Sequence, residues 1–347
     1  MSILEALWLS SLLLAALALA IMAALIVARM ISTRRRVVRE AERRRQIGLL
    51  LRAPPSRALA EDVEPAGALL TDVAIELVGL VRGEEREDFL ASAARLGVPE
   101  SLRTRLRTGN ARTRLTAAEA LGQFHDPRSR ATLEEALDDS SAEVRLTAAL
   151  ALASAGDAPP AKMLVERLGI GTREQSLLAV SLLREIARQK PEEVKALVLD
   201  EASPPQVKAA AIEALSASGD YSLVPVIADL AAKANVEADE LPRYLAALGA
   251  FGHPAAARAV TRRMDAPLAQ VRAAAAEAAG RIGIVEADER LGDLLGDTDW
   301  WVRLRAAEAL VRLGPRGLSV LQAVAESGAE PARCTAALAL AERQGAQ

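Results

Sequence analysis

The sequence is nearly without the residues that build most catalytic and metal centres. One cysteine, Cys334, occurs among 347 residues, which excludes an intrachain disulfide, a cysteine zinc site and an iron–sulfur cluster. Two histidines, His125 and His253, leave too few ligands for a transition-metal site or a histidine-based triad. No GxGxxG, Walker or GxSxG motif is present. We therefore expect no enzyme of the usual kinds and no bound cofactor or metal.

Aromatic residues are scarce and the charge is unevenly divided. Aromatics make up only 2% of the chain, which argues against an all-β fold and removes the stacking platforms of RNA-binding sheets. Residues 1–52 carry nine arginines against three glutamates, so their net charge is +6, whereas residues 53–347 have a net charge of −9. A domain that binds nucleic acid carries a basic surface, whereas residues 53–347 are acidic. We expect no nucleic-acid partner.

The long apolar run at residues 7–28 contains no charged residue. As a helix it would span about 33 Å, enough for a bilayer core of about 30 Å. A cleaved signal peptide is the alternative, but it needs basic residues before the run, and only Glu5 is charged there. We expect an uncleaved transmembrane anchor.

The flanks of this run predict its orientation. Eight arginines follow the run between residues 29 and 45 and no basic residue precedes it. Because positive charge stays in the cytoplasm, we expect a single-pass protein of the bacterial inner membrane with its N-terminus outside and its large C-terminal part cytoplasmic. The arginines of a helical arm over residues 31–52 would then contact anionic lipid, although they are also explained by a stop-transfer signal alone.

The chain divides into four predicted segments. Ala53-Pro54-Pro55-Ser56 breaks the helical pattern and marks a linker. We expect a membrane anchor at residues 1–30, a basic juxtamembrane helix with its linker at 31–56, a helical cap at 57–110 and repeats at 111–347.

Residues 111–347 repeat one pattern every 30 to 33 residues. The pattern has an anchor position, which is basic in six of eight units. Six positions later the residue is alanine in seven units, and the next is leucine in seven. The anchors are Arg114, Arg145, Gln175, Lys208, Leu241, Arg272, Arg303 and Arg333. Glycines that end the first helix in a left-handed conformation are expected at Gly156, Gly219, Gly252, Gly283 and Gly314.

These columns have a physical interpretation. Alanine lets neighbouring helices approach closely, and leucine fills the space between layers. A second helix follows each glycine, so a unit is a helix–turn–helix that cannot bury its apolar face alone. Stacking buries that face, which predicts an all-α solenoid.

The unit "VRxxAAxAL…G" resembles the HEAT repeat, and in particular the bacterial phycobilisome-lyase-like type. It is seen at Val144-Arg145, Val271-Arg272 and Val302-Arg303, with Asp139 and Asp297 six residues before their arginines. The resemblance covers about residues 100–347. It implies a right-handed α-solenoid of about eight helical hairpins, with second helices lining the concave surface. Gln175 and Leu241 depart from the anchor, which marks their layers as candidates for irregular packing.

The repeated arginines and the tryptophans each allow two interpretations. Arg145, Arg272 and Arg303 could form an anion-binding row, but the resemblance implies Asp–Arg pairs between neighbouring layers. Trp300 and Trp301 could anchor a protein interface, or pack across the turn before Val302. For Cys334, in an alanine- and leucine-rich helix, we expect a buried, inert thiol.

Two neighbouring second helices carry opposite charge. Arg258, Arg262 and Arg263 make one basic, and Asp288, Glu289, Asp293 and Asp297 make the next acidic. A solvated surface would explain both. Alternating patches nevertheless suit a protein partner better than a phosphate backbone, so we expect the protein-binding site here, with Trp300 or Trp301 at its edge.

Enzymatic relatives are disfavoured by missing residues. HEAT-repeat hydroxylases carry His-Glu ligand pairs, whereas His125 precedes Asp126 and His253 precedes Pro254. HEAT-like DNA glycosylases need a basic, aromatic face. We expect a membrane-tethered scaffold for a protein partner such as an inner-membrane enzyme complex, of which a glycosyltransferase is one example. The alternative is a lyase-like or chaperone protein that binds a small molecule or cofactor in the solenoid groove.

Overall fold

The computed structural model of the chain is all-helical, with no strand in the ranges that it describes. The described residues are Met22, Arg29, Met30, 40–51, 64–171, 177–216, 219–235 and 237–345. The predicted membrane anchor at residues 7–28 lies outside them, apart from Met22, and so does the linker at residues 53–56. None of the helices within the described ranges has the length and apolarity needed to cross a bilayer.

The chain forms two compact units, residues 1–129 and 130–347. In the first unit, residues 40–50 are helical. Arg43 in this helix pairs with Glu76, and Leu50 is fully buried. The helices that follow are α2 (Ala68–Val78), α3 (Glu84–Arg95), α4 (Val98–Thr108) and α5 (Ala111–Leu121), and α6 (Pro127–Glu135) begins in this unit.

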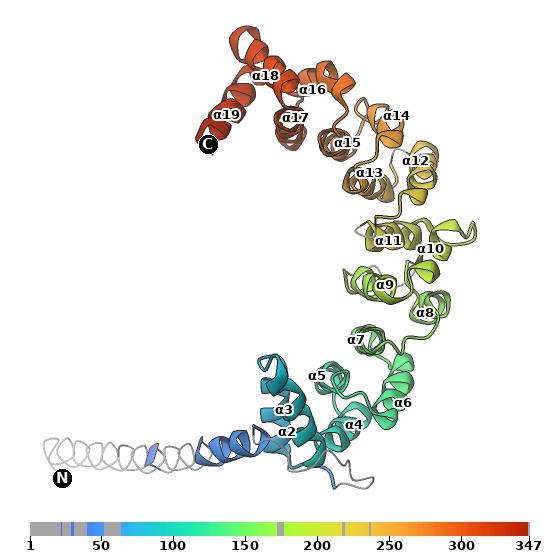
Figure 1. The fold of residues 1–347 in the computed structure, drawn as a ribbon, viewed down its shortest axis with the longest axis vertical. Helices are drawn as coiled ribbons and strands as arrows, with labels where there is room; N and C mark the ends of the chain where they lie inside the picture. The colour runs from blue at the N-terminus through green and yellow to red at the C-terminus, as the bar shows by residue number, and fades with distance from the viewer. Residues whose placement is uncertain are drawn as a thin grey trace, which may run out of the picture. The chain divides into compact units, whose positions relative to one another are not determined.

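The second unit is a stack of helical hairpins (Figure 1). The first helices of the hairpins, which carry the positions of the alanine and leucine columns, are α7 (Ala142–Ala155), α9 (Leu177–Gln189), α11 (Pro205–Leu215), α13 (Glu240–Phe251), α15 (Ala269–Ile282) and α17 (Trp300–Arg312). The second helices are α8 (Ala161–Leu168), α10 (Pro191–Leu199), α12 (Val224–Lys233), α14 (Ala257–Thr261), α16 (Asp288–Leu294) and α18 (Pro315–Ser327). Helix α19 (Ala332–Gly345) lies in the first-helix row and packs on α17 and α18.

Small residues set the spacing between first helices, as the sequence predicts. A Cβ atom added at Gly280 of α15 would lie 2.5 Å from Cα of Ala309 on α17. Gly249 of α13 stands in the same relation to Ala278 of α15, at 2.9 Å. The neighbouring leucine column fills the core, and Leu310 is 0% exposed. The alanine and leucine columns therefore have the packing roles that the repeat predicts.

The predicted left-handed glycine caps are confirmed at Gly156, Gly252 and Gly283. The prediction is wrong for Gly219, because α11 already ends at Leu215, and for Gly314, whose ψ of −141° lies outside the left-handed region. All five glycines have positive φ, and Gly156 and Gly283 end α7 and α15 in the left-handed conformation that any other residue adopts at a cost. The layer with Leu241 at its anchor is regular, since Leu241 is fully buried in α13. Gln175 lies outside the described residues.

Candidate functional site

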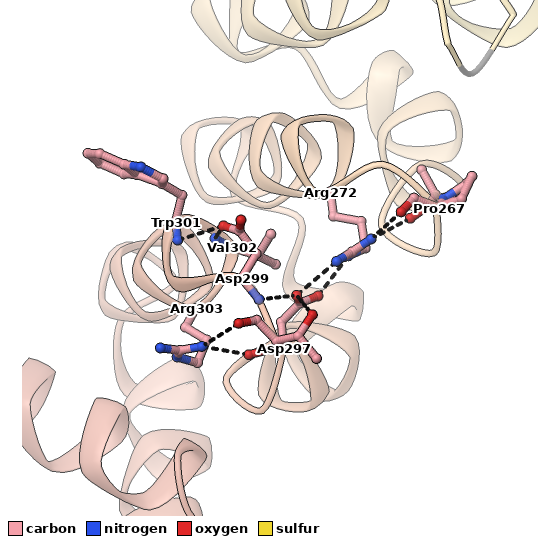
Figure 2. A network of polar contacts seen from close by, with 9 residues as sticks. Pro267, Arg272, Asp297, Asp299, Trp301, Val302 and Arg303 are labelled. Carbon is pink, nitrogen blue, oxygen red and sulfur yellow. Dashed lines mark hydrogen bonds and ion pairs between the residues drawn. The ribbon is translucent and has the colours of Figure 1, made fainter.

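The Asp–Arg pair predicted between neighbouring layers is present at Arg272 and Asp297 (Figure 2). Arg272 donates from Nε and Nη2 to the two carboxylate oxygens of Asp297 at 2.7 and 2.8 Å, and from Nη1 to the carbonyls of Ala266 and Pro267 at 2.9 Å. Burial opposes ionisation of Asp297, but hydrogen bonds from Arg272 and from the Asp299 N–H outweigh it and lower the pKa of Asp297. The bond to Asp297 raises the pKa of Arg272. The pair is structural and does not form an anion site.

The anchor arginines Arg145 and Arg303 donate hydrogen bonds to carbonyls in the turn of their own unit. Arg145 donates to the carbonyls of Asp139 and Ser140 at 2.9 and 3.5 Å. Arg303 donates through Nη1 to those of Asp297 and Thr298 at 2.8 and 3.1 Å. The Arg272–Asp297 pair is thus an interlayer pair of the kind that the resemblance implies.

Several charged side chains on the second helices form ion pairs between layers. Asp288 is 6% exposed and pairs with Arg316 at 2.6 Å, a hydrogen bond that lowers the pKa of Asp288. With Asp297 held by Arg272, half of the predicted acidic patch is therefore structural. Similar layer-to-layer pairs are Arg130–Asp157, Arg167–Asp138, Lys162–Asp200, Lys195–Asp220 and Arg290–Asp265. Sequence reasoning missed these pairs because their partners are 25 to 38 residues apart.

Of the three arginines in the predicted basic patch, Arg263 stabilises the fold, whereas Arg258 and Arg262 have exposed side chains. Arg263 donates from Nε and Nη2 to the Ala231 carbonyl at 3.1 and 2.6 Å, and to those of Ala232 and Ala234, and so caps the end of α12. The side chains of Arg258 and Arg262 are exposed and make no hydrogen bond or ion pair within the described chain. They remain available to a partner.

The second helices do not line the concave side, contrary to expectation. Within residues 130–347, the first helices α7 to α17 follow the inner side of the curve and α8 to α16 follow the outer side (Figure 1). The alanine and glycine contacts between first helices explain this, because they bring that row closer together than the row with larger side chains. Arg258 and Arg262 therefore lie on the outer row.

Trp300 and Trp301 are exposed at the start of α17. Their side chains are 55% and 57% exposed, and the rings meet edge to face with centroids 4.7 Å apart. The Asp299 carboxylate caps the helix by accepting from the N–H of Trp301 at 2.8 Å. This cap fixes the backbone position from which the two tryptophan side chains project. Arg305 lies 6.0 Å from the centroid of Trp301. These rings leave more than half of their surface to solvent, as an interface anchor does.

A cavity of about 570 Å³ opens between α17 and α19. Its walls include Trp300, Arg303, Leu338 and Cys334. Leu338 is 58% exposed, and Cys334 is exposed rather than buried. The expectation of a buried thiol is wrong because no second helix covers α19 within the described residues, so the face that other first helices bury stays open. The repeat pattern alone could not show this.

In the first unit, sequence reasoning missed a buried arginine. Arg103 on α4 is 8% exposed, pairs with Glu100 and Asp126, and donates to Ser129 Oγ at 2.9 Å. The Asp126 carboxylate also accepts from the Ser129 N–H at 2.9 Å, so the cluster holds the start of α6. A proline at the first position of a helix is a pattern that the sequence shows at Pro127. Nothing in the sequence indicates that Arg103 pairs with Asp126, the residue before it. This cluster supports the fold.

No catalytic constellation is evident in the described part of the chain. No group of three or more His, Cys, Asp and Glu side chains there is placed to hold a metal ion. His253 accepts the Ala255 N–H through Nδ1 at 3.2 Å and lies beside the Tyr221 ring, so it serves as a cap. The site that remains is the exposed surface at α14 and around α17 and α19.

Comparison with known proteins identifies the repeats. The family model for HEAT repeats matches residues 99–180 and 242–311. No curated protein matches.

Among solved structures, Kap121p is 13% identical with a TM-score of 0.42 over 79% of this chain, which spans 37% of Kap121p. Human deoxyhypusine hydroxylase is 21% identical with a TM-score of 0.31, over 88% of this chain and 96% of its own. The complex of CpcE and CpcF of phycocyanin lyase from Nostoc is 23% identical with a TM-score of 0.32, over 71% of this chain and 88% of its own. The likeness concerns helical-repeat architecture alone. Residues 99–180 and 242–311 are HEAT repeats.

Proposed function

We propose that this protein is a membrane-tethered scaffold whose HEAT repeats bind a protein partner on the cytoplasmic side of the bacterial inner membrane. The observation that carries the proposal is the apolar surface left uncovered at the end of the repeats. Trp300 and Leu338, which line the cavity, and the adjacent Trp301 each expose more than half of their side chains. Exposed apolar clusters of this kind mark interaction sites on soluble surfaces.

Charge supports the same assignment. Arg258 and Arg262 make no hydrogen bond or ion pair within the described residues, whereas the neighbouring Asp265, Asp288 and Arg290 are paired between layers. Uncommitted charge at an interface rim steers association and makes it sensitive to salt. We therefore propose that the partner contacts the outer row at α14 and the N-terminal end of α17.

The tether is supported by the apolar run at residues 7–28 and by the arginines that follow it. It places the N-terminus outside and the repeats beside the cytoplasmic leaflet, where the arginine-rich arm can contact anionic lipid. The partner is then expected to be an inner-membrane enzyme complex, for example a glycosyltransferase.

Two experiments test this proposal. The full chain, solubilised in detergent, should co-purify with one protein in fixed stoichiometry. The double variant Arg258→Glu and Arg262→Glu should weaken that binding and reduce its salt sensitivity, with little change in stability. Arg184→Glu with Arg188→Glu on α9 is the matched control, because both of these arginines are exposed. Equal loss in both double variants would place the interface elsewhere.

Topology is tested separately with reporter fusions after residue 52. A cytoplasmic reporter should be active, and a reporter that requires export should be silent. An active exported reporter, or a mature N-terminus near residue 28, would overturn the tether.

A small-molecule carrier is the second candidate, because the cavity between α17 and α19 has the volume of a ligand site. Native mass spectrometry of the full chain distinguishes the two functions. A bound small molecule without a stoichiometric protein would favour this candidate, and the reverse would favour the scaffold.

A further inference from the structure

Arg303 repeats the position of Arg272 one layer further along the stack (Figure 2). Each arginine donates through Nη1 to two carbonyls of the turn before its own helix. Arg272 also donates from Nε and Nη2 to the carboxylate of Asp297 in the next layer. The repeat therefore presents the same guanidinium edge to the layer that follows.

For Arg303, that edge has no carboxylate. The position that corresponds to Asp297 in the next layer is Ser327. The Nε atom of Arg303 is buried without a hydrogen-bond acceptor, and Nη2 makes no hydrogen bond within the described chain. A buried donor without an acceptor is rare and costs free energy, so an acceptor that reaches this edge would gain that energy.

The surroundings of Arg303 are suited to an acidic, partly apolar segment. Arg303 lines the cavity between α17 and α19 together with Arg312 and Arg343, for which no ion pair is formed within the described residues. Glu308 on the wall is already paired with Arg305 at 2.9 Å. Glu342 is the second carboxylate on the wall, so three arginines and two glutamates leave one net positive charge. Exposed apolar surface is supplied by Trp300 and Leu338. The cavity thus combines net positive charge with apolar contact area.

We propose that this cavity binds an acidic segment of the protein partner. A carboxylate of that segment pairs with Arg303 as Asp297 pairs with Arg272, and neighbouring apolar side chains of the segment contact Trp300 and Leu338. This inference rests on the proposed scaffold function and specifies the chemistry of the segment that the scaffold recognises.

The probe is a fluorescein-labelled peptide with the sequence of residues 294–302, which contains Asp297, the carboxylate partner of Arg272. Its matched control carries asparagine at the position of Asp297. The full chain in detergent should bind the aspartate peptide saturably, and the asparagine peptide at least tenfold more weakly in fluorescence anisotropy. Arg303→Gln should lose at least tenfold in affinity for the aspartate peptide. Arg188→Glu, which changes an exposed arginine of α9 that does not line the cavity, should bind it as the unaltered chain does.

Two further measurements guard against misfolding of the Arg303→Gln variant. Leu338→Asp changes an exposed position on the cavity wall and should abolish binding by charge repulsion. Cys334, the only cysteine, is exposed on the same wall, so its reaction with a thiol reagent should slow at least fivefold when the aspartate peptide is bound.

The proposal is overturned if the two peptides bind equally, if neither binds, or if Leu338→Asp binds normally. Equal protection of Cys334 by inorganic phosphate or acetate would show a small-anion site instead. Self-association of the chain that Leu338→Asp abolishes would show that a second copy occupies the cavity. None of these outcomes depends on the co-purified partner, so failure here is distinguishable from failure of the scaffold assignment.

Discussion

Substitution Asp297→Asn should locally destabilise the layers formed by α15 and α17. The change keeps the size of the side chain but removes the charge that pairs with Arg272. It also removes one of the two acceptors that the carboxylate offers to Nε and Nη2 of Arg272, at 2.7 and 2.8 Å. The guanidinium then stays in place, because Nη1 still donates to the carbonyls of Ala266 and Pro267.

The magnitude follows from burial. The side chains of Arg272 and Asp297 are 16% and 8% exposed, so solvent screens the pair weakly. Removing one partner of a buried pair costs about 3–5 kcal/mol. The remaining exposure of Arg272 places this pair at the lower end, about 3 kcal/mol. That free energy corresponds to a change of more than about a hundredfold in a local opening constant.

Asp265→Asn is the matched control. Asp265 pairs with Arg290 over the same separation along the chain, but the two side chains are 62% and 46% exposed. Exposed pairs contribute about 0–1 kcal/mol, so hydrogen exchange in this variant should change less than about fivefold.

Hydrogen exchange of the full chain, followed by mass spectrometry, is the appropriate measurement because repeat arrays need not unfold in one step. In Asp297→Asn, protection should fall in α15, α17 and the turn between them, and should persist in α7. Equal effects of the two asparagine variants would show that the buried pair contributes no more than a surface pair. Uniform loss along residues 130–347 would refute the solenoid interpretation of stability.

Three further predictions address packing and pH. Leu310→Ala truncates a fully buried side chain and should cost about 2–5 kcal/mol, with exchange rising mainly in adjacent layers. Gly280→Val should destabilise by about 1–3 kcal/mol or more, measured by thermal denaturation, because a Cβ there meets the backbone of α17. Hydrogen bonding to the Lys195 ammonium lowers the pKa of Asp220 from 3.8 to about 2. The contribution of this pair is therefore present above pH 4 and should be lost as the pH falls from about 4 to 2; unchanged acid sensitivity in Asp220→Asn would contradict it.

The repeat allowed more of the fold to be predicted than of the site. The 30- to 33-residue period, the alanine and leucine columns and the positive-φ glycines all describe contacts between adjacent units, which recur and so appear as a pattern. The candidate site depends on departures from that pattern. Arg263 was grouped with Arg258 and Arg262 by sequence proximity, although its guanidinium reaches the end of α12, about 30 residues earlier. Pairing over such distances leaves no local signal.

The sequence by itself determined that this chain forms stacked helical hairpins, because each unit carries an apolar face that only a neighbouring unit can bury. It also contains the basic arm and the apolar run from which a tether is proposed. Tertiary structure alone decided which charges are free, since Asp288 and Asp297 are held by arginines of other layers while Arg258 and Arg262 are not. It also decided that Cys334 is exposed and that Arg303 meets no carboxylate within the described residues, because no second helix of the described chain covers α19.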